Sequence, residues 1–91
     1  MGLKVTTSCL GYQQITSTAS SVGLTVPTGA TFAMIVSEAQ SVRWRDDGIA
    51  PTTTVGMPLS VGVDFSYDGD LHRIKFIAVV AGAIINVAYY S

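Results

Sequence analysis

Four aspartates in two acidic turns are the residues whose type and spacing come nearest to a metal site. Asp46 and Asp47 precede one glycine, and Asp68 and Asp70 flank another. Ca²⁺ takes about six to eight oxygen ligands, and these carboxylates could supply many of them if the two turns met. Aspartate beside glycine is also ordinary turn chemistry, because Asp bonds its own backbone and Gly accepts positive φ. We therefore interpret both segments as turns and predict no metal.

Cys9 and His72 are the only residues of their types, and they raise the possibility of a thiol nucleophile with a base. Such a pair needs a third orienting group and an oxyanion hole, and no local motif supplies either. We expect Cys9 to be buried as a small hydrophobe and His72 to lie on the surface of a strand. The sequence thus predicts a protein that is not an enzyme, with no catalytic residue and no cofactor.

Arg43, Trp44 and Arg45 form the group best suited to contact another macromolecule, since Trp and Arg are enriched at interface hot spots. Alternation along a strand places Trp44 on one face and both arginines on the other, near Asp46 and Asp47. One interpretation makes Trp44 a core residue with solvated arginines. The other makes Arg43 and Arg45 contacts to an acidic partner surface or a neighbouring subunit.

The C-terminal tyrosines carry a similar pair of interpretations. In a strand, one of Tyr89 and Tyr90 faces the core and the other faces out, where it could stack on a partner. The residues predicted to form a protein interface are Arg43, Trp44, Arg45, Asp46, Asp47 and Tyr90.

Short strands are the elements that must position these side chains. Strands are predicted over residues 3–10, 13–18, 20–27, 32–37, 42–45, 63–67, 71–77 and 84–90, and residues 51–54 are interpreted as a loop or a short edge strand. The continuous apolar run 32–37 is expected to be buried on both faces. No window has a sustained helical period. About eight short strands predict an all-β fold, either a small antiparallel β-sandwich or a jelly-roll-like barrel, in a single domain over residues 1–91.

The composition indicates that part of the surface is covered by a partner. Apolar residues make up 48% of the chain and charged residues 12%, against about 25% charged in an average domain. Small domains gain stability from disulfides, metals or oligomerisation, and one cysteine excludes an internal disulfide. Self-association is therefore predicted. The dispersed Lys and Arg residues and the net charge of −1 argue against nucleic acid, and the apolar stretch 76–90 is shorter than the roughly 20 residues of a membrane span.

Several blocks resemble a family of small tailed-phage virion proteins. The blocks cover residues 22–30, 42–48, 51–52, 55–57, 67–71 and 86–90, within a span of about three quarters of the chain. Arg-Trp-Arg-Asp-Asp-Gly at 43–48 and Tyr-Asp-Gly-Asp at 67–70 are the most specific of them. The resemblance implies a capsid decoration (cement) protein, built as a β-sandwich and set on the shell as a homotrimer.

Two functions from different classes follow from these observations. The first is a homo-oligomer that binds the phage major capsid protein and stabilises the head, located on the virion surface after synthesis in the bacterial host cytoplasm. The alternative is a tail, neck or fibre module that binds carbohydrate or a host receptor, with Trp44 and Tyr90 as aromatic platforms beside acidic loops.

Overall fold

Eight β-strands make up the fold. The structure is a computed structural model that describes residues 8–17 and 20–91. The strands are β1 (Cys9–Ser17), β2 (Val22–Gly23), β3 (Phe32–Glu38), β4 (Val42–Arg45), β5 (Met57–Leu59), β6 (Phe65–Tyr67), β7 (Lys75–Ala78) and β8 (Ala83–Tyr90). Within these ranges no helix is long and apolar enough to cross a membrane.

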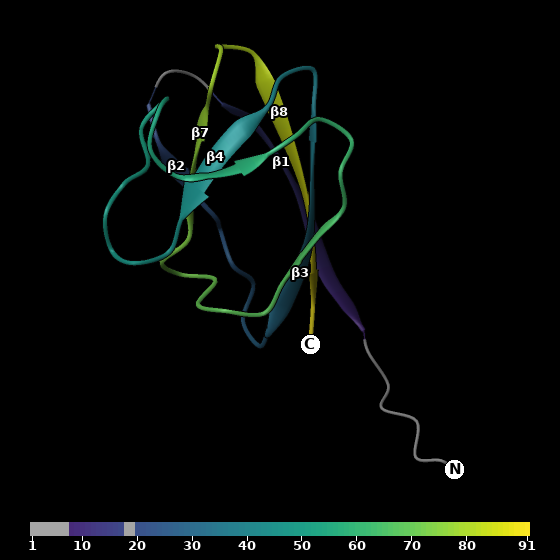
Figure 1. Ribbon diagram of the computed structural model, residues 1–91. Helices are drawn as coiled ribbons and strands as arrows, with labels where there is room; N and C mark the ends of the chain where they lie inside the picture. The colour runs from purple at the N-terminus through teal and green to yellow at the C-terminus, as the bar shows by residue number, and fades with distance from the viewer. Residues whose placement is uncertain (1–7, 18–19) are drawn as a thin grey trace.

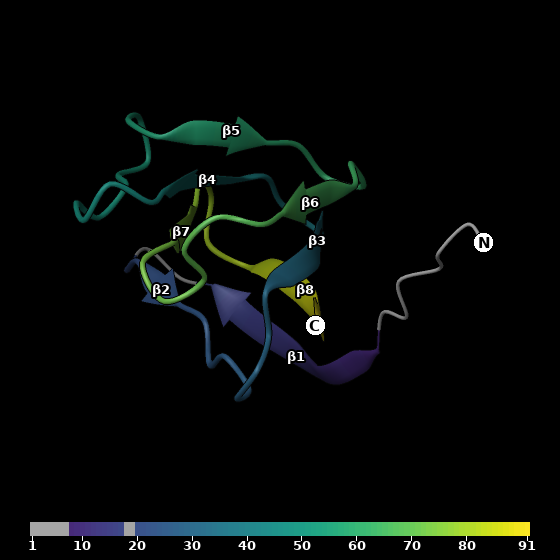
Figure 2. The same ribbon diagram turned by 90° about the horizontal axis from the view of Figure 1, so that it is seen from below.

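The strands form two four-stranded antiparallel sheets, in the orders β1-β8-β3-β6 and β2-β7-β4-β5. Figure 1 shows the long strands β1, β3 and β8 side by side, and Figure 2 shows the two sheets as separate layers. The sheets do not close into a barrel. The predicted all-β class is therefore confirmed, and of the two predicted architectures the sandwich is the correct one.

The core lies between the two layers and follows the alternation of each strand. Along β8, Ala83, Ile85, Val87 and Tyr89 are buried, while the residues between them are half-buried. Along β3, buried and accessible residues also alternate, and Met34 is 37% exposed. The prediction that residues 32–37 are buried on both faces is therefore wrong. An antiparallel sheet in a sandwich has only one face against the core.

The first strand departs from the prediction in two ways. The expected break between residues 10 and 13 is absent, because β1 continues across it with a bulge between Cys9 and Gly11. A bulge inserts one extra residue while the strand continues, so a glycine here bends β1 without ending it. Cys9 is exposed and not buried as predicted, since it lies at the accessible start of this edge strand. Residues 3–7 of the predicted strand lie outside the described ranges.

Three predicted strands are shorter than expected, and one of them, predicted over residues 63–67, begins only at Phe65. Only Val22 and Gly23 of the segment 20–27 pair with β7, after which the chain leaves the sheet. Residues 71–73 form a turn, because the Asp70 carbonyl accepts from the backbone N–H groups of Arg73 (3.0 Å) and Ile74 (3.2 Å). His72 consequently lies exposed in this turn and not on a strand.

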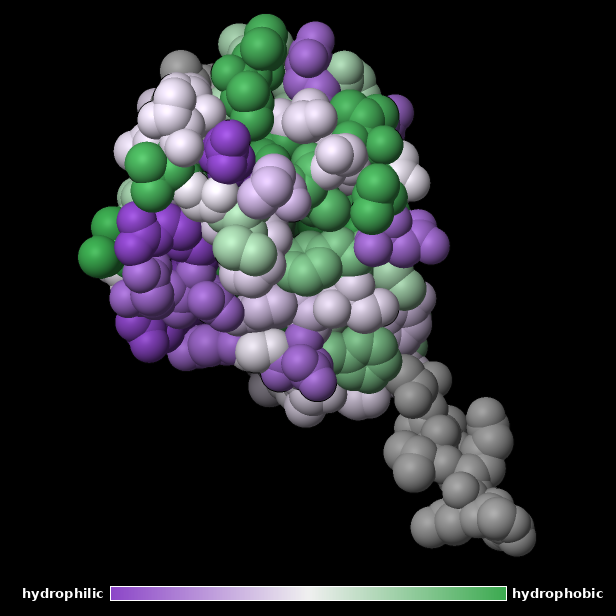
Figure 3. Space-filling view, viewed as in Figure 1, coloured by the Kyte–Doolittle hydropathy of each residue, from purple (hydrophilic) through white to green (hydrophobic). Residues whose placement is uncertain are grey.

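The two ends of the sandwich differ in polarity. The β3–β4, β5–β6 and β7–β8 turns share one end, where Val79 N–H donates to the Ser41 carbonyl and Gly62 N–H to the Ser37 carbonyl. Exposed valines gather there, namely Val61, Val63, Val79 and Val80. Figure 3 shows apolar atoms at the top, over the β7–β8 turn, and hydrophilic atoms at the lower left, over the turns that follow β4 and β6.

Candidate functional site

Trp44 is a bridge between the two layers. It projects from β4 toward the other sheet, where its ring stacks on Phe65 (centroids 5.1 Å apart, planes 24° apart) and meets Tyr67 edge-on at 5.9 Å. Aromatic pairs in these geometries contribute about 0.5–1.5 kcal/mol beyond their buried area. The interpretation of Trp44 as a core-packing residue is thus confirmed, although one side of the residue still lines a surface groove.

Arg43 holds the long β4–β5 loop against the outer face of the second sheet. Its guanidinium donates to the Gly56 carbonyl at 2.8 Å and to the Thr53 carbonyl at 3.3 Å. Pro51 of this loop is buried. Ile77, the neighbour of Arg43 on β7, shares its side of the sheet and is only 6% exposed. Around Arg43 and Ile77, the outer face of the second sheet is therefore covered by the chain's own loop, and Arg43 is occupied in holding it.

Arg45 and Asp47 form a bidentate ion pair at the rim of the same region. The Arg45 Nε and Nη2 atoms lie 3.0 and 2.5 Å from the two Asp47 carboxylate oxygens. The hydrogen bonds from Arg45 hold the pKa of Asp47 below its usual value, and the pKa of Arg45 is raised by the same bonds. Both groups are thus fixed as charges at the surface.

Asp46 is oriented in a different direction and accepts a hydrogen bond from the Tyr67 hydroxyl at 2.5 Å. Burial raises the pKa of Tyr67, and the bond to Asp46 raises it further. Gly48 completes the turn with a φ of +87°, where an L side chain is strained, and the Arg73 guanidinium lies over it. The predicted Asp-Asp-Gly turn is therefore confirmed.

An open groove of about 520 Å³ brings four of the predicted residues together. It is lined by Trp44, Arg45, Asp46, Asp47, Val55, Gly56 and Met57. Val55, in the β4–β5 loop, and Met57, at the start of β5, are more than half exposed and were not predicted as site residues, because an isolated apolar residue carries no periodic signal. Arg43 does not line this groove, although its guanidinium donates to the carbonyl of Gly56, which does.

The acidic turns do not form a metal centre in the described ranges, where no group of three or more His, Cys, Asp and Glu side chains is close enough to hold an ion. Asp46 is bonded to Tyr67 and Asp47 to Arg45. Asp70 accepts from the His72 backbone N–H at 3.0 Å. Each of these carboxylates thus serves a turn or a neighbouring side chain.

Tyr90 lies on the other sheet, apart from the groove. It stacks on Phe32 of the adjacent strand, with centroids 5.2 Å and planes 15° apart, while Tyr89 is buried. The prediction that one C-terminal tyrosine faces the core and the other faces out is confirmed. The predicted interface residues therefore fall on two separate surfaces.

Tyr90 belongs to a surface that we call the open face, the outer side of the sheet β1-β8-β3-β6. Register and alternation assign its residues. They are Tyr12, Gln14, Thr16, Phe32, Met34, Val36, Glu38, Ser66, Ile84, Asn86, Ala88 and Tyr90. The open face carries a single charged residue, Glu38, and its most exposed aromatic residue is Tyr12, at 63%.

Asn86 organises the polar part of the open face. Its side-chain carbonyl accepts from the Tyr12 hydroxyl and from the Gln14 amide, the latter at 3.0 Å, and its amide donates to Glu38 at 2.8 Å. These bonds join β1, β8 and β3 and fix Tyr12 in one orientation. A fixed aromatic side chain loses less conformational entropy when a partner binds.

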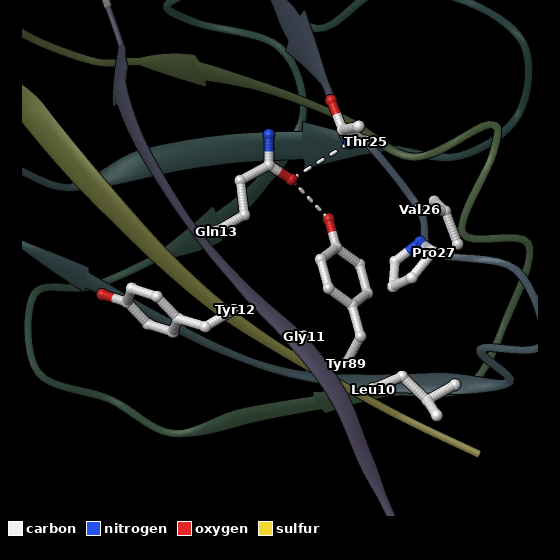
Figure 4. Close-up of a pocket in the computed structure, with 8 residues that line it drawn as sticks. All are labelled: Leu10, Gly11, Tyr12, Gln13, Thr25, Val26, Pro27 and Tyr89. Atoms are coloured by element: carbon white, nitrogen blue, oxygen red, sulfur yellow. Dashed lines mark hydrogen bonds between the residues drawn. The ribbon is translucent and has the colours of Figure 1, made fainter.

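A second groove, of about 430 Å³, lies beside β1 (Figure 4). Its floor is polar, because Gln13 Oε1 accepts from the Tyr89 hydroxyl at 2.6 Å and from Thr25 N–H at 3.0 Å. Its walls are apolar and come from Leu10, Val26 and Pro27. The hydrogen bond to Gln13 holds the segment 25–27 beside β1 through a side chain, with no strand pairing between them.

Sequence reasoning found the β4 residues but missed most of the open face. Phe32 and Met34 belong to the run 32–37, which was predicted to be buried on both faces. Tyr12 lies in the break that was predicted between residues 10 and 13. Asn86, a polar residue within the apolar run 84–90, was the signal that could have found the face. Comparison with protein families, curated proteins and solved structures finds no match for this chain.

Proposed function

We propose that this protein is a non-enzymatic virion structural protein, a capsid decoration protein that binds and stabilises a phage head as a homo-oligomer. One observation carries the proposal: the open face is almost uncharged, whereas the opposite outer face carries Arg43, Arg45 and Lys75 and is partly covered by the β4–β5 loop. Interface centres are depleted in charge and enriched in aromatic residues and Met. The proposal also draws on the resemblance of blocks 43–48 and 67–70 to phage virion proteins.

The mechanism follows from many identical copies on one shell. Each copy would span neighbouring subunits of the major capsid protein with its open face, where burial of Tyr12, Phe32, Met34 and Tyr90 would supply the binding energy. A ligand that binds only the assembled shell stabilises it by mass action. The partners are therefore further copies of this chain and the capsid protein, and the site of action is the outer surface of the virion.

The test uses heads assembled without this protein. Purified protein added to them should bind to saturation and raise the temperature at which the heads release their DNA. Binding is measured by co-sedimentation, and release by fluorescence of a DNA dye during heating. Absence of binding, or binding with no change in release temperature, would refute the proposed function.

A second candidate is a tail, neck or fibre module that binds carbohydrate, and the groove at Trp44 is the observation that favours it. The groove combines part of an aromatic residue with the Arg45–Asp47 pair, which offers both donors and acceptors to sugar hydroxyls. Trp44→Ala is a poor test, because Trp44 packs on Phe65 and Tyr67. Glycan-array binding that is lost in Asp47→Asn, with the thermal unfolding temperature unchanged, would support this candidate over the first.

A further inference from the structure

The outer edge of β1 is a backbone surface without a partner among the described residues. β1 is the end strand of its sheet, is nine residues long, and pairs on one side with β8. On the other side, Tyr12, Gln14 and Thr16 form no backbone hydrogen bond with any described segment. Their side chains are exposed as well, so the edge is accessible to another strand.

The direction of the peptide groups follows from the bonds at the end of β1. The Ser17 carbonyl faces the start of β8, where Gly82 N–H donates to it at 3.3 Å. Peptide groups alternate in direction along an antiparallel strand, so those of Ile15 also face β8. Those of Gln14 and Thr16 therefore face away from the sheet, and the same alternation directs Tyr12 outward.

β1 has almost none of the features that keep edge strands apart. Natural edges are protected by Lys, by Pro, by very short strands or by a covering loop. β1 contains no charged residue and no proline, and its only irregularity is the bulge at its start. β2, β5 and β6, the other end strands, have only two or three residues each. The fold thus protects three of its edges by shortness and leaves β1 long and neutral.

We propose that β1 pairs antiparallel with β1 of a second copy of this chain, about a two-fold axis at Gln14. In this register Gln14 lies opposite Gln14, and Tyr12 lies opposite Thr16 of the second copy. All three residues direct their peptide groups outward, so each pair would exchange backbone hydrogen bonds. A second copy is the favoured occupant because a strand without charge meets no like charge when it pairs with itself.

The groove of Figure 4 supplies an independent reason for this occupant. In the same register, Ile15 of the second copy lies opposite Gln13, which forms the groove floor. Side chains of directly opposed residues point to the same face of a sheet. The Ile15 side chain would therefore enter the space between Leu10 and Pro27 and bury apolar surface on both sides.

The pairing would join two sheets into one continuous eight-stranded sheet and double the open face. It rests on the homo-oligomer part of the proposed function, and it implies an even number of copies, whereas the resemblance to phage proteins implies three. The number of copies in solution therefore distinguishes the proposed β1 pairing from a trimer.

A charge-swap experiment tests the pairing. Gln14→Lys and Gln14→Glu each place like charges opposite each other at the two-fold axis, so each should raise the dimer dissociation constant about fivefold. Mixing the two variants should restore association, because opposite charges then face each other. Sedimentation equilibrium measures the constants, and Ser66→Lys, on the opposite edge strand β6, is the matched control that should leave them unchanged.

Thr16→Pro provides a second test that does not depend on charge. The substitution removes the outward N–H of residue 16 and none of the donors used in the β1–β8 pairing. The two-fold axis repeats the loss in the second copy, so two backbone hydrogen bonds are lost and the dissociation constant should rise at least about tenfold. A wild-type protein that is monomeric at all concentrations would overturn both the pairing and the homo-oligomer. An oligomer that responds to neither the Gln14 variants nor Thr16→Pro, or that contains three copies, would overturn the pairing alone.

Discussion

At the scale of single residues, Gly69 shows how closely the turns pack on the aromatic cluster. A Cβ atom at this position would lie 2.6 Å from Cζ and 2.9 Å from Cε1 of Tyr67. Tyr67 is only 7% exposed and is held by Trp44 and Asp46, so its ring has little room to move. A glycine is therefore required at position 69 because a Cβ atom there would collide with the Tyr67 ring. The turn-forming residue types in the sequence do not reveal this requirement.

Gly69→Ala should consequently destabilise the fold by about 1–3 kcal/mol through overpacking. Urea unfolding monitored by Trp44 fluorescence measures the loss directly. Gly23→Ala is the matched control, because the nearest atom to its added Cβ is the Ile74 carbonyl oxygen at 4.0 Å. The control should change the free energy of unfolding by less than about 1 kcal/mol. Equal losses in the two variants would contradict the packing argument.

The burial of Tyr89 leads us to expect that the free energy of unfolding falls at alkaline pH. Burial raises its pKa from 10.0 to about 12. Below pH 10 the hydroxyl is protonated in both the folded and the unfolded protein. Between pH 10 and about 12 the unfolded chain releases this proton while the folded chain keeps it, so unfolding becomes easier as pH rises. The stabilisation is thus complete below pH 10 and is lost through pH 12.

The measurement is the thermal unfolding temperature between pH 9 and about pH 12, the range in which an ordinary tyrosine also ionises. Tyr89→Phe should show a shallower fall than the wild type, since it has no hydroxyl to titrate. Gln13 keeps its bond from Thr25 N–H in this variant. A wild-type curve that runs parallel to the variant's would exclude Tyr89 as a source of the alkaline fall.

At the scale of elements, Arg43 joins β4 to the loop that follows it. The sequence placed this arginine on the outer face correctly but assigned it to a partner surface. Its actual acceptors, the carbonyls of Thr53 and Gly56, are backbone groups of a loop whose path has no periodic signal. Strand alternation could therefore predict the side to which Arg43 points but not what it would meet there.

Arg43→Lys should loosen this loop while the sandwich remains folded. A lysine lacks the planar fork that reaches two carbonyls at once. We expect faster amide hydrogen exchange at residues 52–56 and a loss of about 1–2 kcal/mol in the free energy of unfolding. Arg45→Lys, which alters only the exposed pair with Asp47, should leave exchange in the loop unchanged. If both variants speed exchange equally, Arg43 has no special role.

The strands show which local sequence signals are sufficient to predict an element and its bounds. The apolar run 84–90 after the Gly82 turn and the alternation at 42–45 predicted β8 and β4 almost to the residue. Prediction failed where a polar contact outside the strand decided the outcome. Asp70 turns residues 71–73 away from β7, and a bulge carries β1 past Gly11. The β4 residues of the candidate site were predictable because alternation is a local signal. The open face could be predicted only from the pairing of β1, β8 and β3, which joins distant parts of the chain.

At the scale of the whole molecule, the sandwich is asymmetric, because its two outer faces differ in charge and in coverage. One outer face is partly covered by the β4–β5 loop and carries Lys75, and the open face carries only Glu38 as a charge. The groove at Trp44 lies elsewhere, at the charged end of the molecule. The two proposed functions therefore use different surfaces, and each surface contains one exposed methionine.

Met34 lies on the open face and Met57 lines the groove at Trp44, so the same substitution at each position separates the two functions. Both side chains are exposed, and lysine at either is tolerated by the fold because its charge reaches solvent. If the open face binds the shell, Met34→Lys places an unpaired charge in the interface and should weaken binding to heads by about tenfold or more, while Met57→Lys leaves it unchanged. Co-sedimentation with heads measures both affinities. The reverse order of effects would move the binding surface to the groove and favour the carbohydrate-binding candidate.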